Sequence, residues 1–189
     1  MGKVICLINI TADGFVDSNY VIADAEFHEF VHGLLANTHT VGFGKSTFEL
    51  FQGIWPPILE KDNQSASQVK MAKALNDMPK IAYSSTLQTT TWNNSTITKS
   101  VNPDQLQQMK RDSEKDLLTI GSPGILAALT KLDLVDEYYF PVQPLIAGGG
   151  NVRLFDQLNL DNRQPLKFIG SKQLKSGVVI NHYQKEKNS

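Results

Sequence analysis

Five apolar stretches alternate with stretches of helical spacing along the chain, and this alternation narrows the folds open to it. The first stretch, KVICLINI at residues 3–10, is a nearly continuous apolar run rich in Val and Ile. Such a run predicts a strand buried on both faces, as in a parallel sheet. Four later stretches also predict strands: THTVGF, PKIAYSS, DLLTIG and VDEYYFPVQPLI, with STITKS as a possible short addition.

Helical patterns fill the gaps between these strands. Apolar residues recur at helical intervals from Phe27 to Leu35, and Asp24 is the expected N-cap of that helix. Further helices are expected in KSTFELF, SASQVKMAKALND, NPDQLQQMKRDSEK and SPGILAALTKLDL. The stretch GIWPPILEKDNQ carries two prolines and is expected to be a loop.

Two alternating segments, PLKFIGSKQL and GVVINHYQK, predict a closing hairpin. The whole order predicts a three-layer α/β/α sandwich with a mainly parallel central sheet and a C-terminal antiparallel hairpin. We expect a single domain over residues 1–185 and a frayed tail over residues 186–189.

Composition excludes several classes of function. The 18 basic and 19 acidic residues give a net charge of −1, which argues against broad binding to nucleic acid. A single cysteine, Cys6, excludes a disulfide within the chain. No stretch approaches ~20 uninterrupted apolar residues, so no membrane span is expected. These features favour a cytoplasmic protein.

Small and polar residues gather where three of the predicted strands end. The three sets are Gly44-Lys45-Ser46-Thr47, Ser84-Ser85-Thr86 and Gly121-Ser122-Pro123-Gly124. In an open parallel sheet, ligands bind outside the carboxyl ends of the strands. The first and third sets combine glycines with the unpaired amides of a helix start, which favour an anion. Two such starts facing each other could hold a pyrophosphate, with Lys45 as an added positive charge.

Ordinary turn chemistry is the more common explanation of each set when it is taken alone. Neither G-x-x-x-x-G-K-S/T nor G-x-G-x-x-G occurs in the chain, so the usual phosphate-binding motifs are absent. The spacing alone therefore indicates only a nucleotide-like site.

A series of motifs in order adds a family resemblance that covers nearly the whole chain. TADGFVD is similar to S-x-D-G-x-I-A, FGKSTFELF to L-G-R-x-T-Y-E, and KIAYSSTLQTTTWNNSTI to K-x-V-x-S-x-T-L…W-x-N-S-T-x-I. LLTIGSPGILAAL and LVDEYYFPVQPLIAGGGNVRLF match two further motifs. Together they resemble the dihydrofolate reductase-like superfamily, and within it the reductase domain of bacterial bifunctional riboflavin-biosynthesis deaminase-reductases.

The resemblance implies a stand-alone NADPH-dependent reductase of a pyrimidine-like or pteridine-like heterocycle, similar to 5-amino-6-(5-phosphoribosylamino)uracil reductase. It implies that one group of residues binds the cofactor's phosphates at a helix start: Gly44, Lys45, Ser46 and Thr47. A second group would lie by the adenosine ribose and its 2′-phosphate: Ser84, Ser85 and Thr86. A third group would cover the pyrophosphate: Gly121, Ser122, Gly124, Ile125 and Leu126. A fourth would lie near the nicotinamide and the substrate: Ala12, Asp13, Gly14 and the glycines 148–150.

Two departures from the family pattern bear on the chemistry. Lys45 stands where the family has arginine, so the bidentate fork that suits a phosphate is missing. No zinc-deaminase signature occurs, so deamination in such a pathway would need a separate protein.

Several residues are candidates for catalysis or substrate binding, each with an ordinary structural alternative. Asp13 could hold a ring edge or relay a proton, or it could cap its own turn. Asp24 and Glu26 could bind a substrate ring, or they could serve the start of the first helix. Arg153 and Gly149 could meet the substrate, with a surface ion pair as the alternative for Arg153.

The remaining polar and aromatic residues suggest no other site. His28 and His32 are four residues apart, but no H-E-x-x-H motif accompanies them, so we expect a solvated helix face and no metal. Trp55 is expected to pack in a loop. Reduction of dihydrofolate is the alternative activity, and a nucleotide-binding module without turnover is the alternative class. The family resemblance also suggests a homodimer.

Overall fold

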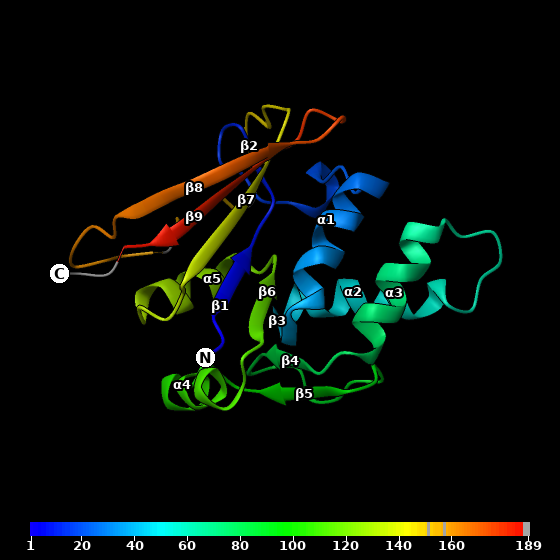
Figure 1. The fold of residues 1–189 in the computed structure, drawn as a ribbon, viewed down its shortest axis with the longest axis horizontal. Coiled ribbons are helices and arrows are strands. Elements are labelled where there is room, and N and C mark those ends of the chain that lie inside the picture. The colour runs from blue at the N-terminus through cyan, green and yellow to red at the C-terminus, as the bar shows by residue number, and fades with distance from the viewer. Residues whose placement is uncertain (151, 157, 187–189) are drawn as a thin grey trace.

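The computed structural model describes residues 1–150, 152–156 and 158–186. Within these residues one nine-stranded sheet runs through the molecule, in the order β5-β4-β3-β6-β1-β7-β9-β8, with β2 paired to β7 beside this path (Figure 1). The strands are β1 (Val4–Leu7), β2 (Ile10–Thr11), β3 (Thr38–Gly44), β4 (Lys80–Tyr83), β5 (Ser95–Thr98), β6 (Asp116–Ile120), β7 (Glu137–Gln143), β8 (Leu166–Gln173) and β9 (Val179–Lys185).

The first seven strands are parallel wherever they pair with one another, whereas β9 pairs antiparallel with β7 and with β8. The strand β9 pairs with both β7 and β8, so the predicted C-terminal hairpin is confirmed. The predicted tail falls largely on residues 187–189, which lie outside the described residues.

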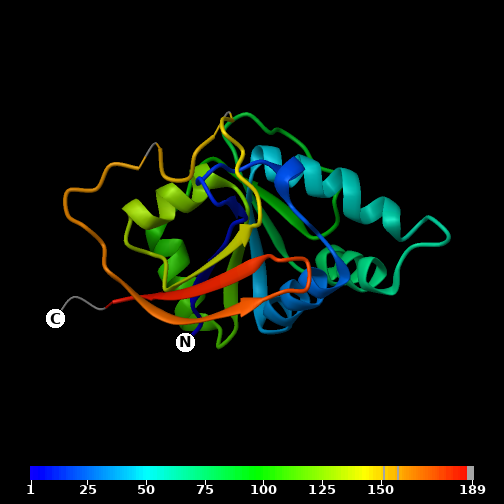
Figure 2. The ribbon, with the colours of Figure 1, turned by 90° about the horizontal axis from the view of Figure 1, so that it is seen from above.

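Helices cover both faces of the sheet, which confirms the three-layer prediction (Figure 2). They are α1 (Ala25–Ala36), α2 (Lys45–Ile58), α3 (Ala66–Asp77), α4 (Pro103–Asp112) and α5 (Pro123–Lys131), with a short 3-10 turn, η1 (Ser18–Tyr20). The first three pack into one apolar cluster, and α4 and α5 pack into another on the opposite face. No helix in the described part of the chain is long and apolar enough to cross a membrane.

The central strand β1 contributes to both clusters because its side chains alternate between the faces. Ile5 and Leu7 belong to the cluster with α1–α3, whereas Val4 and Cys6, with Ile8 just after the strand, belong to the cluster with α4 and α5. All five are buried. This two-sided burial is the reason that the KVICLINI run has no polar alternation.

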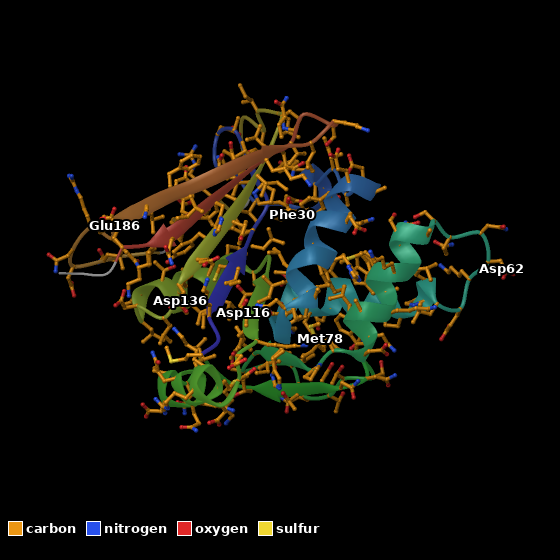
Figure 3. All side chains as sticks on the ribbon, in the orientation of Figure 1. Phe30, Asp62, Met78, Asp116, Asp136 and Glu186 are labelled. Carbon is orange, nitrogen blue, oxygen red and sulfur yellow. The ribbon has the colours of Figure 1, made fainter. Side chains whose placement is uncertain are left out.

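Carboxylates from later in the chain hold the amino end of β1 in place. The backbone N–H of Lys3 donates to Asp116 Oδ1 at 2.9 Å, and that of Val4 donates to Asp136 Oδ2 at 2.7 Å. Asp136 also accepts from the buried Nζ of Lys110 at 2.6 Å. Figure 3 shows Asp116 and Asp136 beside the start of β1.

The residue that precedes this strand has little free space. The amide of Gly2 donates to the carbonyl oxygens of Lys110 at 2.9 Å and Ser113 at 2.7 Å. A Cβ atom at this position would overlap the carbonyl oxygen of Lys115. Gly2 is buried, so the chain enters the sheet through a gap that admits only a glycine.

Side-chain caps begin three of the helices. Asp24 accepts from the amide of Phe27 at 2.8 Å, as predicted for α1. Asn102 caps α4 ahead of Pro103, also as predicted. Ser65 forms a capping box with Gln68 at the start of α3.

The expected loop GIWPPILEKDNQ is wrong in its first half, because α2 continues to Ile58 through Pro56 and Pro57. Phe48, Phe51, Trp55 and Ile58 recur at spacings of three and four residues and join the cluster with α1 and α3. Burial of this stripe outweighs the two hydrogen bonds that the prolines remove. Both prolines fall in the last turn, where the amide of Leu59 bonds to the carbonyl of Pro56 and closes the helix.

The expected strand KVICLINI is also divided, into β1 and β2, with Asn9 in the break between them. Asn9 Oδ1 accepts from Nε2 of Gln143 at 2.9 Å. The break therefore places a polar side chain at the carboxyl end of the central strand.

Candidate active site

The three small-polar sets lie at neighbouring strand ends. The strands β4, β3 and β6 are parallel and adjacent, so their carboxyl ends meet at one edge of the sheet. Gly44 is the register partner of Tyr83, and Leu7 that of Ile120. Residues 44–47, 84–86 and 121–124 therefore follow three consecutive strands at the edge where ligands of such sheets bind.

The starts of α2 and α5 are in direct contact. The backbone N–H of Gly44 donates to Ser122 Oγ at 2.7 Å. A Cβ atom on Gly121 would lie 3.2 Å from Cγ2 of Thr47. Gly121 and Ser122 both have left-handed backbone conformations, with φ of 63° and 60°, which turn the chain sharply into α5. The predicted pair of facing helix starts is thus present.

Neither of these two helix starts has a side-chain cap, in contrast to α1, α3 and α4. Gly44 has no side chain to offer, and the hydroxyl of Ser122 is used by the amide of Gly44. The first amides of α2 therefore lack the acceptor that a cap would supply, and at the start of α5 the same holds for the amide of Gly124, because Pro123 has no N–H and Ile125 donates to the carbonyl of Ser122. Together with the helix dipoles, they favour a negatively charged group at this junction.

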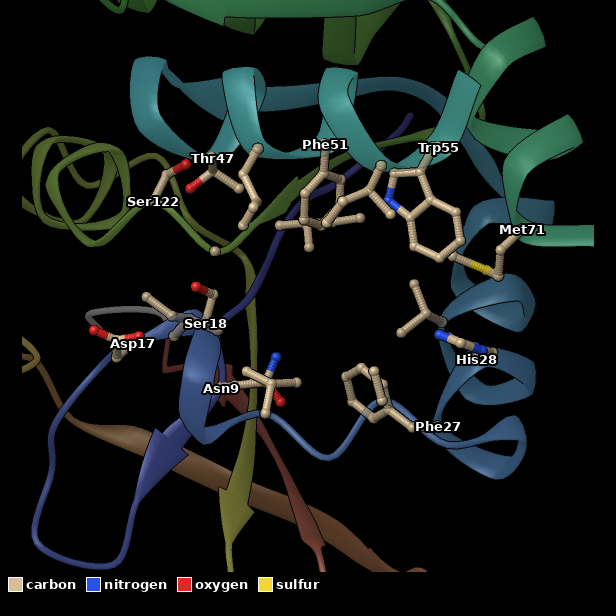
Figure 4. A pocket seen from close by; sticks show the side chains of 18 of the residues that line it. Asn9, Asp17, Ser18, Phe27, His28, Thr47, Phe51, Trp55, Met71 and Ser122 are labelled. Carbon is tan, nitrogen blue, oxygen red and sulfur yellow. The ribbon is translucent and has the colours of Figure 1, made fainter. Parts of the chain in front are cut away.

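A cavity of about 340 Å³ opens from this junction and runs between α1 and α2 (Figure 4). Its size suits a small organic ligand. Figure 4 shows Thr47 and Ser122 at one end of the cavity and His28, Trp55 and Met71 at the other.

The far end of the cavity is mostly apolar. Side chains from three helices form this wall: Phe27 and Val31 from α1, Leu50, Phe51, Ile54, Trp55 and Ile58 from α2, and Met71 from α3. Polar side chains at the cavity come from Asn9, Asp17, Ser18, His28, Gln68 and the helix starts.

Two of these wall residues differ from the sequence-based expectation. His28 is 7 % exposed and contacts Trp55 edge to face at 5.7 Å between ring centroids, so it does not lie on a solvated face. Burial lowers the pKa of the His28 imidazole. Trp55 lies in α2 rather than in a loop. His28 Nδ1 and Trp55 Nε1 are both buried without a hydrogen-bond partner.

Among the predicted cofactor residues, Thr47, Gly121 and Ser122 line the cavity. Gly44 and Ile125 are next to them, since a Cβ atom on Gly44 would lie 3.3 Å from Cγ1 of Ile125. Lys45, Ser46 and Gly124 are exposed at the same junction. Lys45 lies 4.0 Å from Glu49 in an ion pair on the surface of α2.

Leu126 does not fit its predicted role. Its side chain is fully buried in the cluster with α4 and α5, and its amide donates to the carbonyl of Ser122. Neither group is left for a cofactor.

The Ser84–Thr86 set is divided between an internal and an exposed role. Ser84 Oγ accepts from the amides of Thr86 at 3.1 Å and Leu87 at 2.9 Å, and its side chain is buried. Ser84 thus shapes the turn after β4. Ser85 and Thr86 are exposed and remain available to a ligand.

Asp13 hydrogen-bonds to the loop after β7 from the loop after β2, and it does not line the cavity. Its carboxylate accepts from Thr11 Oγ1 at 2.6 Å and from the amides of Ala147 at 3.0 Å and Gly148 at 2.8 Å. The Thr11 hydroxyl, followed by these amides, lowers the pKa of the Asp13 carboxyl to about 2. The role is structural, but it joins a distant loop rather than only capping Asp13's own turn, and a carboxyl of this kind is a poor proton donor near neutral pH.

The neighbours of Asp13 belong to the same pair of loops. The amide of Ala12 bonds to the carbonyl of Leu145, and Leu154 bonds to the carbonyl of Gly14, which has a φ of 86°. These contacts close the end of β7 against the loop that follows β2.

The predicted substrate residues have structural partners outside the cavity. Asp24 is the cap of α1, and Glu26 Oε2 accepts from the amide of Lys175 at 2.9 Å. The guanidinium of Arg153 lies 4.9 Å from the Phe15 ring centre, and the carbonyl of Gly149 faces the Tyr20 hydroxyl at 3.4 Å. None of the four lines the cavity.

Sequence reasoning missed the pair formed by Asn9 and Gln143. Each is a lone polar residue inside an otherwise apolar strand segment, which is the signal that could have found it. Gln143 is fully buried. Within the described ranges, no group of three His, Cys, Asp or Glu side chains gathers as a metal site.

Comparisons with known proteins agree with this architecture. Residues 2–180 match the RibD C-terminal domain family. The uncharacterized protein YyaP of Bacillus subtilis is 22 % identical over 184 residues, covering 94 % of this chain and 92 % of that protein.

Solved structures show the same fold at low sequence identity. A protein of Shewanella sp. PV-4 named for riboflavin biosynthesis superposes with a TM-score of 0.71 at 16 % identity, covering 98 % of this chain and 99 % of the other. A pyrimidine reductase-like protein of Corynebacterium diphtheriae gives 0.65 at 10 % identity, covering 99 % and 93 %. RibD of Acinetobacter baumannii gives 0.69 at 13 % identity, and there the match covers 99 % of this chain but 59 % of the longer protein.

Proposed function

The chain belongs to the RibD C-terminal domain family, and on that premise we propose that it is an NADPH-dependent reductase of a pyrimidine-like or pteridine-like heterocycle. The family implies an oxidoreductase of the type found in riboflavin biosynthesis. One observation carries the choice of cofactor: the uncapped starts of α2 and α5 meet through the hydrogen bond from Gly44 to Ser122.

The residues at this junction fit the diphosphate of a dinucleotide. The first amides of α2, the amide of Gly124 at the start of α5, two helix dipoles and the hydroxyl of Thr47 lie at one end of the cavity. The lack of a side chain at Gly44 and Gly121 lets the two helix starts approach each other closely, with Ile125 and Thr47 in the space that a Cβ atom would need. In the proposal, Lys45, Ser46, Ser85 and Thr86 contact the adenosine side from the exposed rim.

The chain's own contribution to the reaction is positioning and exclusion of water. NADPH, when bound, supplies a hydride to the substrate ring. The apolar walls from α1 and α2 would hold that ring against the cofactor and keep water out. Because Asp13 is engaged in the loop contacts, the proposal does not give it the proton transfer.

Calorimetry and absorbance measurements test the proposal together. We expect NADPH to bind, and its absorbance to fall when a heterocyclic substrate is added. Absence of binding by either NADPH or NADH would remove the basis for a reductase.

Lys45→Ala should weaken NADPH binding about fivefold, or about 1 kcal/mol, through loss of a charge at a helix start. Lys73→Ala, at an exposed position of α3, is the control.

A comparison with NADH, which lacks the 2′-phosphate, shows whether Lys45 contacts that phosphate or affects the binding of both coenzymes alike. If Lys45 meets the 2′-phosphate, Lys45→Ala weakens NADPH binding more than NADH binding. Equal losses for the two coenzymes would contradict this role.

A nucleotide-binding module without turnover is the second candidate. The observation that favours it is the engagement of Asp13, which removes the one proton donor that the sequence suggested. Tight NADPH binding with no oxidation across pyrimidines, pteridines and dihydrofolate would select the module over the reductase.

A homodimer and a cytoplasmic location complete the proposal. The strand β8 ends the sheet order and carries two exposed apolar side chains, Phe168 at 56 % and Ile169 at 45 % exposure. Pairing of this edge with a second copy would cover them. Light scattering should show that the wild type is a dimer and that Phe168→Lys is a monomer. A monomeric wild type would refute the proposed dimer.

The proposed cytoplasmic location fits the buried free thiol of Cys6, which suits a reducing compartment.

A further inference from the structure

The orientation of the Asn9 side chain is fixed by a chain of hydrogen bonds. The backbone N–H of Ile22 can only donate, and it donates to Gln143 at 3.0 Å, so the acceptor must be the amide oxygen of Gln143. The nitrogen of Gln143 is then the donor to Asn9 at 2.9 Å, and the acceptor on Asn9 must be its oxygen. The Asn9 amide nitrogen is left as a donor.

This donor lies at the cavity. Asn9 lines it, and Figure 4 shows its side chain between Ser18 and Phe27, with the amide nitrogen toward the open space. No oxygen atom in the described part of the chain accepts a hydrogen bond from it. Gln143 is fully buried, so the arrangement that aims Asn9 is held in the core and does not depend on solvent.

The rest of the far end offers no positive charge. Burial lowers the pKa of His28, which keeps its imidazole neutral near pH 7. Asp17, the acidic residue among those that line the cavity, lies beside Ser18 on the side of Ser122 (Figure 4). No lysine or arginine is among the lining residues. A phosphate ester placed here would lose its hydration and gain no cation.

The end of the cavity that does favour an anion is at the starts of α2 and α5. Figure 4 places Thr47 and Ser122 there, opposite the wall of Trp55, Met71 and His28. Under the proposed function the cofactor's diphosphate takes that end. The substrate is then left with the apolar end and the donor of Asn9.

We propose that the substrate of this site is an uncharged planar heterocycle with a carbonyl or ring-nitrogen acceptor and an apolar substituent, and that Asn9 is the residue that recognises the acceptor. A sugar-phosphate ester is excluded as the substrate. This inference rests on the proposed reductase function, which assigns the other end of the cavity to the cofactor.

Binding of three probes without NADPH tests the substrate class. The probes are 6,7-dimethyllumazine, which is uncharged and methylated, 5-amino-6-ribitylaminouracil, and the 5′-phosphate of that ribityl compound. Calorimetry, with Trp55 fluorescence as a second readout, should give the tightest binding for the lumazine. The phosphate ester should bind about tenfold more weakly than its unphosphorylated partner. An ester that binds as tightly as its partner, or more tightly, overturns the proposal.

Variants test the two features separately. Asn9→Asp replaces the donor by an acceptor and should weaken lumazine binding about tenfold or more, with Asn93→Asp at an exposed position as the control. Leu50→Lys adds a cation at the cavity. The affinity for the phosphate ester, divided by the affinity for the unphosphorylated ribityl compound, should rise about tenfold in this variant. Leu59→Lys is its matched control, because Leu50 and Leu59 are 40 % and 39 % exposed and Leu59 does not line the cavity.

The outcomes separate this inference from the proposed function. Since Leu50 is exposed, its lysine variant keeps the test valid even if Asn9→Asp does not fold. If Leu50→Lys leaves the ratio of the two affinities unchanged, the result contradicts the inference that the phosphate ester is rejected because this end of the cavity has no cation. Failure of NADPH to bind, with probe binding as expected, refutes the reductase but leaves the ligand class in place.

Discussion

At the scale of single residues, the sequence predicted local roles better than long-range ones. Asp24 precedes its helix by one residue, so its capping bond to Phe27 could be predicted from the pattern alone. Asp13 remained open between catalysis and turn geometry, because its partners Ala147 and Gly148 lie more than 130 residues away. The hydrogen bond between Asn9 and Gln143 could not be predicted for the same reason, because 134 residues separate the two.

Asp13 gives a prediction on pH dependence. Its carboxyl has a lowered pKa of about 2, so the bonds to Ala147 and Gly148 are fully present above the ordinary value of about 3.9 and are lost as pH falls through about 2. The amide proton shifts of Ala147 and Gly148 should therefore stay constant from about pH 5 to pH 3. A midpoint near the ordinary aspartate value would contradict the loop contact. Asp13→Asn serves as the uncharged reference.

Lys80 gives a prediction on stability. It is 1 % exposed, and its Nζ donates to the carbonyls of Leu75, Asn76 and Met78 at 2.6–3.1 Å, which closes the C-terminal end of α3. Lys80→Met should lower the free energy of unfolding by about 2 kcal/mol, because carbonyl groups would be buried without partners. Denaturant unfolding at pH 7 measures this free energy. The control is Lys73→Met, at an exposed position of α3. Equal stabilities of the two variants would show that the cap is dispensable.

At the scale of elements, strands and helix starts followed from the sequence, whereas one helix end did not. The caps and the apolar periodicity lie within a few residues of each start, so local patterns are sufficient there. The extension of α2 through Pro56 and Pro57 depends on burial of Trp55 and Ile58 against α1 and α3. That contact is tertiary, and the prolines alone indicate a loop. The walls of the cavity were missed for the same reason.

The contact between α2 and α5 yields a prediction of its own. Gly121 has a φ of 63°, and a Cβ atom there would lie 3.2 Å from Thr47. Gly121→Ala should destabilise the protein by about 1–2 kcal/mol and weaken NADPH binding, because it strains the turn and pushes the two helix starts apart. Gly124→Ala meets no atom within 4 Å and should have little effect on either quantity. Thermal unfolding and calorimetry of both variants provide the measurement, and equal effects would contradict the role of the junction.

At the scale of the whole molecule, the fold class could be predicted but the strand order could not. Alternating strands and helices are sufficient for a layered α/β sandwich. The placement of β6 between β1 and β3 depends on pairings across some 110 residues, such as Val4 with Leu117, which no local pattern encodes. The edge that carries the site follows from this order.

The sharing of β1 between the two apolar clusters predicts one cooperative unit. Trp55 and Trp92 report on the cluster with α1–α3, and the thiol of Cys6 reports on the opposite one. Tryptophan fluorescence and Cys6 labelling should therefore give the same midpoint in denaturant. Two separated midpoints would show that the faces unfold independently.

The narrow gap around Gly2 has a practical consequence for anyone who prepares this protein. Cloning sites and affinity tags commonly rewrite the second codon, and any side chain introduced there would displace the first strand from its carboxylate anchors. A variant with a larger residue at position 2 should therefore unfold at a lower denaturant concentration than the wild type. A protein that keeps glycine at this position retains the native entry of the chain into the sheet.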